Sequence, residues 1–99
     1  MIVVIAKLKA KTGQEQRVEQ ALRDILPKVR AEEGTLEYTL CRAQNDPSTV
    51  MVLEKYRDME AFLAHGSTPY LAEMFEVVTP LLDGDLSVEM FDVLDAAEH

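Results

Sequence analysis

The amino-acid sequence predicts one α+β domain in which a four-stranded antiparallel sheet is combined with helices. Two observations support this prediction. Apolar residues recur at every second position in four segments, which is typical of strands, and at every third or fourth position in the stretches between, which is typical of helices. The 99 residues suffice for one small core, with roughly 60–70% of the unfolded chain's surface buried on folding. Residues 1–99 are therefore expected to form a single domain.

The first segment, residues 2–9, carries apolar residues on both faces of a strand, so both faces of the sheet require covering. A helix is expected to follow over residues 13–30. Its start matches a capping box, in which the side chains of Thr12 and Glu15 accept hydrogen bonds from free backbone N–H groups. Its apolar residues form one stripe that faces the sheet: Val18, Leu22, Ile25, Leu26 and Val29.

Pro27 interrupts this helix. Because proline removes an N–H donor and its ring crowds the preceding turn, we expect a bend or an early end there, and Gly34 stops the helix in either case. A strand follows over residues 35–43. Residues 45–48 are turn formers, so we expect a hairpin with the next strand, residues 49–57.

Two helices are expected after the hairpin, over residues 58–65 and 69–82, and a last strand over residues 86–94. Gly66 tolerates the left-handed conformation that often ends a helix. Thr68 and Pro69 have the character of an N-cap and a first-turn proline. The order strand, helix, strand, strand, helix, strand is the split βαβ arrangement of ferredoxin-like folds.

Helices can cover only one face of such a sheet. The other face keeps an apolar set: Val3, Ile5, Met51, Leu53, Phe91 and Val93. A soluble monomer rarely exposes an apolar patch of this size. A second copy of the same sheet, related by two-fold symmetry, is the simplest cover, so the sequence predicts a homodimer.

Charge and composition exclude several classes of partner. The net charge of -8, with no cluster of Lys or Arg, repels nucleic acid and anionic lipid surfaces. The start of the chain lacks the pattern of a signal peptide, and no segment has the ~18 apolar residues of a membrane span, so we expect a soluble, cytoplasmic protein. Cys41 is the only cysteine, and we expect a half-buried residue in a strand.

The candidate chemistry lies where the third strand enters the next helix. His65 exchanges protons near neutral pH and is a candidate general acid or base. Glu54 ends an apolar run, and we expect the two to approach one another, so that Glu54 orients the imidazole. The alternatives are a helix-end histidine that caps carbonyl groups, and a glutamate that is solvated or paired with Lys or Arg. His99 ends the chain, where we expect mobility.

Three segments carry a resemblance to a known family. They are E-G-T-L-E-Y-T-L at residues 33–40, E-K-Y-R-D at residues 54–58, and E-A-F-L-A-H followed by S-T-P-Y-L at residues 60–71. Together they resemble the antibiotic biosynthesis monooxygenase (ABM) domain family across nearly the whole chain. The resemblance implies a dimer with face-to-face sheets, a dimeric α/β barrel. It also implies a reaction in which a small aromatic phenol, quinol or anthrone is deprotonated and reacts directly with oxygen, without a cofactor.

An apolar pocket between helices and sheet is expected to bind this substrate. Its candidate lining residues are Tyr38, Tyr70, Phe62, Met74 and Phe75. Tyr70 stands where many family members carry a second histidine. That departure keeps open a non-catalytic protein of the same fold that binds small ligands or acts under stress, and an isomerase is also left open. No metal site is expected, because one internal histidine and one cysteine make no ligand set, and no Gly-rich phosphate loop is present.

Overall fold

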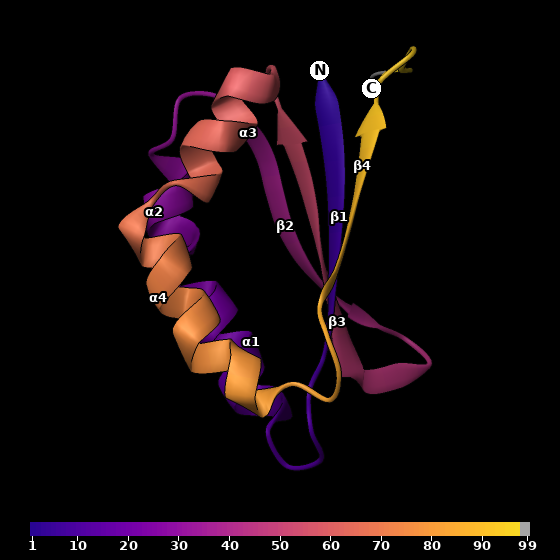
Figure 1. Ribbon diagram of the computed structural model, residues 1–99. Coiled ribbons are helices and arrows are strands. Elements are labelled where there is room, and N and C mark those ends of the chain that lie inside the picture. The colour runs from indigo at the N-terminus through magenta and orange to yellow at the C-terminus, as the bar shows by residue number, and fades with distance from the viewer. Residues whose placement is uncertain (98–99) are drawn as a thin grey trace.

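The computed structural model describes residues 1–97, which contain one antiparallel sheet of four strands (Figure 1). The strands lie in the order β2-β3-β1-β4. Their bounds are β1 Ile2–Lys9, β2 Thr35–Ala43, β3 Asp46–Tyr56 and β4 Ser87–Asp92. The predicted α+β, ferredoxin-like fold is therefore confirmed. His99, for which mobility was expected, lies outside the described residues.

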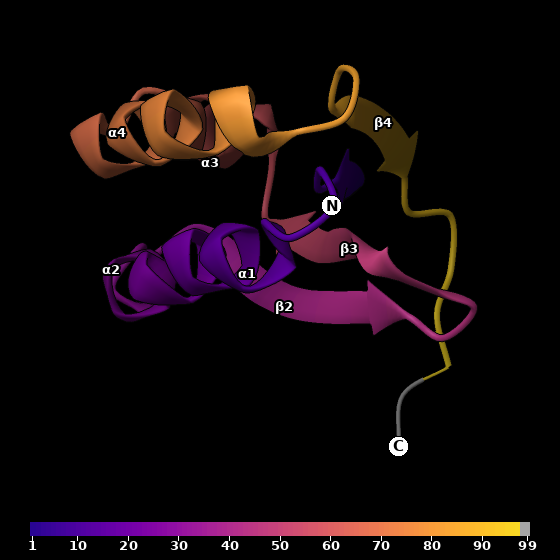
Figure 2. The same cartoon turned by 90° about the horizontal axis from the view of Figure 1, so that it is seen from below.

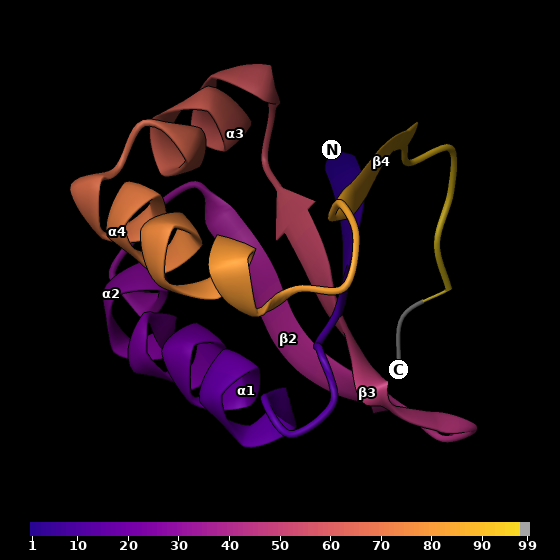
Figure 3. The same ribbon diagram turned by 60° about the horizontal axis from the view of Figure 1, so that its bottom comes forward.

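The helices of residues 1–97 all lie on one face of the sheet, as Figure 2 shows. They form two pairs, one between β1 and β2 and one between β3 and β4. Their bounds are α1 Glu15–Asp24, α2 Leu26–Arg30, α3 Met59–Gly66 and α4 Pro69–Val78, with a short 3-10 helix, η1 Thr79–Leu81. From η1 the chain crosses to β4 at the edge of the sheet (Figure 3). In the described part of the chain, no helix combines the length and the apolar character needed to cross a membrane.

The core lies between this helix layer and the sheet, because alternate strand positions and one stripe of each long helix are buried together. It includes Val4, Leu8, Val18, Leu22, Val50, Val52, Met74 and Val78. At its edge, Arg42 of β2 donates hydrogen bonds to Glu19 of α1, with Nε 3.0 Å from Oε2. These hydrogen bonds hold the pKa of Glu19 below its ordinary value, so the pair joins helix and sheet.

The predicted capping box at the start of α1 is wrong. Gly13 adopts a left-handed conformation with φ +87°, so the chain reverses there and the helix begins only at Glu15. Gln14 takes the N-cap position without a side-chain cap, and the Gly13 N–H donates to Glu15 Oε1 over 3.1 Å. Glu15 thus accepts a backbone hydrogen bond as a capping-box glutamate does, whereas Thr12 does not cap the helix.

The predicted bend at Pro27 is confirmed. α1 ends at Asp24, and α2 begins at Leu26 with Pro27 in its first turn. Proline is tolerated there because first-turn N–H groups have no partner within the helix. The second helix ends at Arg30, the predicted boundary.

The hairpin differs from its prediction. Its turn consists of Gln44 and Asn45, and β3 already begins at Asp46, so residues 46–48 belong to the strand. These residues still make the side-chain hydrogen bonds typical of turns, since the Asp46 carboxylate accepts hydrogen bonds from Ser48 and Thr49. These hydrogen bonds lower the pKa of Asp46 to about 2. They hold an irregular stretch in which the β2–β3 register shifts.

The two helices after the hairpin also end differently. Gly66 is the last residue of α3 and is not left-handed, since positive φ occurs in the described chain only at Gly13 and Gly84. Pro69 starts α4 as predicted, but the Thr68 hydroxyl donates to the His65 carbonyl instead of capping. α4 ends at Val78, four residues early, and gives way to η1. β4 is likewise shorter than predicted, six residues instead of nine.

The face of the sheet away from the helices carries the predicted apolar side chains except that of Val93, which lies beyond the end of β4 at Asp92. On β1 and β3, Val3, Ile5, Met51 and Leu53 alternate with buried residues and are themselves only half-buried. Phe91 of β4 pairs with Val3 and is 46% exposed. Cys41 of β2 is free and half-buried. We call this surface the open face.

Candidate functional site

A cavity of about 250 Å³ lies between the helix layer and the sheet. Its wall is mostly apolar and includes Val4, Leu22, Val52, Phe62, Met74 and Phe75. Three side chains bring titratable groups to it, those of Tyr38, Glu54 and His65. The cavity thus combines an apolar wall with a small number of polar groups, which is typical of small-molecule binding sites.

Glu54 reaches the cavity because β3 turns alternate side chains toward the helices. Val50, Val52, Glu54 and Tyr56 are the buried members of this alternation. The Tyr56 hydroxyl donates a hydrogen bond to the Glu54 carboxylate. Burial raises the pKa of Glu54, although the Tyr56 hydrogen bond and the nearby His65 act in the opposite direction.

His65 reaches the cavity from α3. The helix starts at Asp58, whose carboxylate accepts a hydrogen bond from the Ala61 N–H over 2.9 Å. Ala61 and His65, one turn apart, are the buried residues of this helix. Only 4% of His65 is exposed, so the imidazole is placed by packing.

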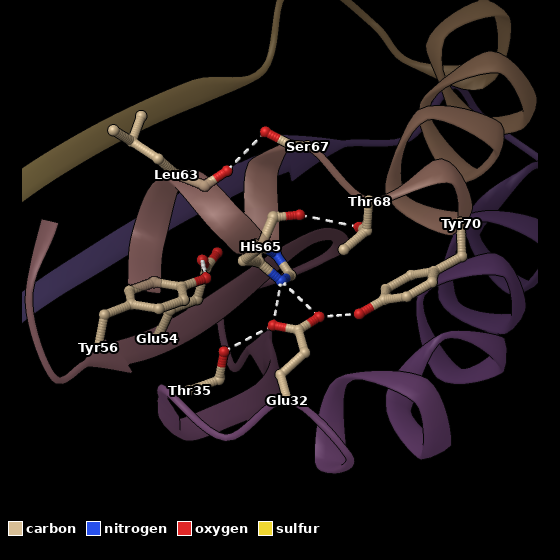
Figure 4. A network of polar contacts seen from close by, with 9 residues as sticks. All are labelled: Glu32, Thr35, Glu54, Tyr56, Leu63, His65, Ser67, Thr68 and Tyr70. Carbon is tan, nitrogen blue, oxygen red and sulfur yellow. Dashed lines mark hydrogen bonds and ion pairs between the residues drawn. The ribbon is translucent and has the colours of Figure 1, made fainter. Parts of the chain in front are cut away.

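The carboxylate that holds His65 is Glu32, and sequence reasoning missed it. His65 Nδ1 lies 2.9 and 3.0 Å from the two carboxylate oxygens of Glu32 (Figure 4). Glu32 itself accepts hydrogen bonds from the hydroxyl groups of Thr35, over 2.6 Å, and Tyr70. It precedes the E-G-T segment at the entry to β2, but 33 positions separate it from His65, and no local spacing indicates the pair.

The predicted pairing of Glu54 with His65 is therefore corrected. The two side chains line the same cavity, but Glu54 is hydrogen-bonded to Tyr56 and His65 to Glu32. The physical reason is that Glu54 continues the inward face of β3, where the Tyr56 hydroxyl is available. The loop before β2 brings Glu32 to the Nδ1 edge of the imidazole.

The loop that carries Glu32 lies close to α3 because Gly34 has no side chain. A Cβ atom built on Gly34 would stand 2.4 Å from Ala61 Cβ, far inside van der Waals contact. The Gly34 carbonyl also accepts a hydrogen bond from the Arg57 N–H over 3.0 Å. Close approach at Gly34 thus sets the position of Glu32 relative to His65.

Tyr38 of β2 borders the same imidazole, with ring centroids 5.2 Å apart. Burial raises the pKa of its phenol, and the negative charges of Glu54 and Glu32 add to the effect. The hydroxyl therefore stays protonated at neutral pH and can donate a hydrogen bond to an oxygen atom in the cavity.

The other predicted lining residues divide into two groups. Phe62, Met74 and Phe75 line the cavity, and Phe62 packs edge-on against the Tyr56 ring. Tyr70 does not line it, because its hydroxyl is used on Glu32. Contact of any of these residues with a substrate stays a prediction. Within residues 1–97, no three His, Cys, Asp or Glu side chains converge in a metal-binding group.

Fold and site together define a class: a ferredoxin-like protein with an apolar cavity and a buried histidine that is hydrogen-bonded to a half-buried carboxylate. The sequence model of the family described as "Antibiotic biosynthesis monooxygenase" (ABM) matches residues 1–77. The chain belongs to this family, and the resemblance noted in its sequence is confirmed.

Individual relatives agree with this assignment. A protein of Bacillus subtilis (strain 168) named "Putative monooxygenase YcnE" is 28% identical over 89% of this chain and 93% of its own length. The structure of a "putative antibiotic biosynthesis monooxygenase" from Caulobacter crescentus CB15 is 30% identical, with a TM-score of 0.90 over 95% of this chain and 90% of that one. The structure of Rv0793 from Mycobacterium tuberculosis, at 24% identity, shares the fold with a TM-score of 0.92 over 98% of both chains.

Proposed function

We propose that this protein is a monooxygenase that uses no cofactor and acts on a small aromatic phenol or quinol. The observation that carries the proposal is the cavity, whose apolar wall is interrupted only by the phenol of Tyr38, the carboxyl of Glu54 and the imidazole of His65. Membership of the ABM family and the names of its relatives support the same reaction class.

The proposed reaction begins with proton removal by His65. The imidazole takes the phenol proton, and a ring carbon of the resulting phenolate forms a bond to molecular oxygen. The imidazolium returns its proton to the peroxide, and loss of water then leaves a quinone. One oxygen atom enters the product and the other becomes water, so the substrate supplies all four electrons and no external reductant is needed.

Tyr38 and Glu54 have supporting roles in this proposal. The Tyr38 hydroxyl donates to the substrate oxygen and stabilises the negative charge that develops there. Glu54 places a second polar side chain in the same cavity, where the nearby His65 opposes the rise in the pKa of Glu54 that burial causes. The apolar residues Phe62, Met74 and Phe75 hold the ring and keep bulk water away from the reactive carbon.

The size of the cavity narrows the substrate class. Pockets that hold drug-sized molecules are roughly 300–1,000 Å³. A cavity of about 250 Å³ suits a smaller molecule of one or two rings. We therefore favour simple phenols and quinols over a three-ring anthrone.

The open face supports the proposal that the protein works as a homodimer with its sheets face to face. Apolar side chains of β1, β3 and β4 lie together there without cover from any described helix. Burying them against a second copy removes an apolar surface from water, which is the main driving force of such association.

Oxygen uptake on a panel of phenols, quinols and anthrones tests the proposed reaction, with ligand binding measured on the same panel. We expect uptake with a one- or two-ring substrate, and isotopically labelled oxygen should appear equally in product and water. A His65→Ala variant should bind the substrate and consume oxygen at least ~100-fold more slowly than the wild type. Binding by the wild-type protein without oxygen uptake would instead identify a non-catalytic ligand-binding protein.

A further inference from the structure

We propose that Glu32 is the positioning residue of the site: it fixes the tautomer of His65 so that Nε2 is the basic atom presented to a ligand. The inference rests on the proposed function only in giving His65 the role of base. Its structural evidence is independent and lies in the contacts of Glu32.

The first argument is chemical. An ionised carboxylate has acceptor sites only, so the two contacts of Nδ1 with Glu32, at 2.9 and 3.0 Å, require a proton on Nδ1. In the neutral imidazole the other nitrogen, Nε2, then keeps its lone pair. No hydrogen bond joins Nε2 to any residue of the described chain, so it is available to a ligand.

The second argument is mechanical. Glu32 is held by hydroxyl groups from two further elements, Thr35 at the start of β2 and Tyr70 on α4 (Figure 4). Its side chain is only 16% exposed. A carboxylate bound by donors from three elements has little freedom to rotate, and the imidazole that it holds is oriented with it.

The third argument concerns location. Glu32 lines a surface cleft that contains several charged side chains and is separate from the apolar cavity, and His65 is the one described residue that lines both. Glu32 therefore acts on the cavity through His65 and does not contact a ligand there.

Other charged groups surround this pair. Glu54 approaches His65 from β3, and Glu33, Arg57 and Glu60 line the surface cleft. Lys28 of α2 lies 5.6 Å from the centre of the Tyr70 ring. Among the described residues, Glu32 alone is hydrogen-bonded to the imidazole, so the tautomer is assigned to it.

NMR of protein labelled at the histidine nitrogens tests the inference without any substrate. At a pH where His65 is neutral, the wild-type ring should carry its proton on Nδ1. A Glu32→Ala variant should shift the ring toward the Nε2–H form, which histidine favours in water. Glu33→Gln is the matched control, since this neighbouring exposed glutamate lines the same cleft without bonding His65.

Kinetics provide the second readout. Glu32→Gln keeps the shape and one acceptor but loses the charge that stabilises the imidazolium, so kcat should fall about 10- to 100-fold, as for other orienting carboxylates, with KM nearly unchanged. Glu33→Gln should match the wild type. A wild-type ring that carries its proton on Nε2, or a Glu32→Ala ring that keeps the wild-type preference for Nδ1–H, would overturn the inference.

The two proposals fail in different ways. If the wild-type protein consumes no oxygen but His65 carries its proton on Nδ1 and loses this preference in Glu32→Ala, the reaction is wrong and the positioning role of Glu32 stands. If Glu32→Ala does not fold, Glu32→Leu takes its place, since leucine keeps most of the volume and removes both acceptor oxygens, and its ring should lose the preference for Nδ1–H. Glu32→Gln should keep the Nδ1–H form, because its amide oxygen still accepts.

Discussion

Replacing Gly34 by alanine should destabilise the protein through one defined contact. The new Cβ would lie 2.4 Å from Ala61 Cβ, more than 1 Å inside the ~3.5–4.0 Å separation of carbon atoms in contact. Both atoms are attached directly to the backbone, so no rotamer change relieves the overlap and α3 must move. Overpacking of this kind costs about 1–3 kcal/mol, and we place this case in the upper half of that range.

A smaller opposing effect comes from the unfolded chain. Gly34 does not have a positive φ, so alanine fits its backbone and gains about 0.4–1 kcal/mol from reduced unfolded-state entropy. The net loss is therefore roughly 1–2.5 kcal/mol. For a domain of this size, that corresponds to a fall in Tm on the order of 4–20 °C.

Urea and thermal unfolding at fixed protein concentration measure this loss. Gly66→Ala is the matched control, since its Cβ would meet no atom within 4 Å and the residue lies in α3. It should be neutral or stabilising by up to ~1 kcal/mol. Ala61→Gly added to Gly34→Ala should recover part of the loss by removing the second carbon. Equal stability of Gly34→Ala and the wild type would refute the reasoning.

Four further outcomes are expected. His65→Ala should lower turnover by roughly 10²- to 10⁴-fold while ligand affinity, measured by titration calorimetry, changes little. Tyr38→Phe should lower kcat by a smaller factor at unchanged fold and stability, and a rate equal to that of the wild type would remove Tyr38 from the site. The pKa of Glu54 is raised in the folded state, so its contribution to stability is complete below the ordinary value of 4.5 and is lost as pH rises through the folded value. Unfolding free energies measured against pH should therefore decline less steeply above 4.5 in Glu54→Gln, and an equal or steeper decline would contradict the assignment. In light scattering, the wild type should exceed the 11.1 kDa of one chain and Leu53→Glu should approach it, whereas a wild-type monomer would exclude the dimer.

Patterns local in sequence predicted much of the fold. The alternation that runs from Val50 to Tyr56 places Glu54 on the buried face of β3, and its arrival in the cavity follows from that period of two. Pro27 has no N–H to donate to a preceding turn, and the first helix ends at Asp24 before a second begins at Leu26. Predictions were wrong where one residue type occurs in several conformations. Asp46, predicted in a turn, binds its neighbours inside a strand, and Gly66, predicted to be left-handed, is helical.

The partner of His65 was not predictable in this way. The corner where the strand of Glu54 enters the helix of His65 favours pairing of these two residues, whereas Glu32 is brought to His65 by the loop that packs at Gly34. Which carboxylate contacts Nδ1 depends on the close approach of Gly34 to Ala61. Residue spacing in a single sequence does not reveal such a tertiary contact. The fold class could be obtained from periodicity, while the geometry of the site required the packed structure.

The contacts of Glu32 have a consequence for folding. His65 and Tyr70 stand 33 and 38 positions away from it, on the far side of the β2–β3 hairpin. Contacts at such separation form only after large loops have closed, so they depend on the assembled tertiary structure and not on any isolated segment. A folding intermediate with helices and hairpin but without docked layers would contain every residue of the site and yet have no oriented imidazole. The Nδ1–H tautomer of His65 therefore reports whether the helices have packed on the sheet. During refolding, the NMR signal of this tautomer should recover no earlier than the last step of core packing.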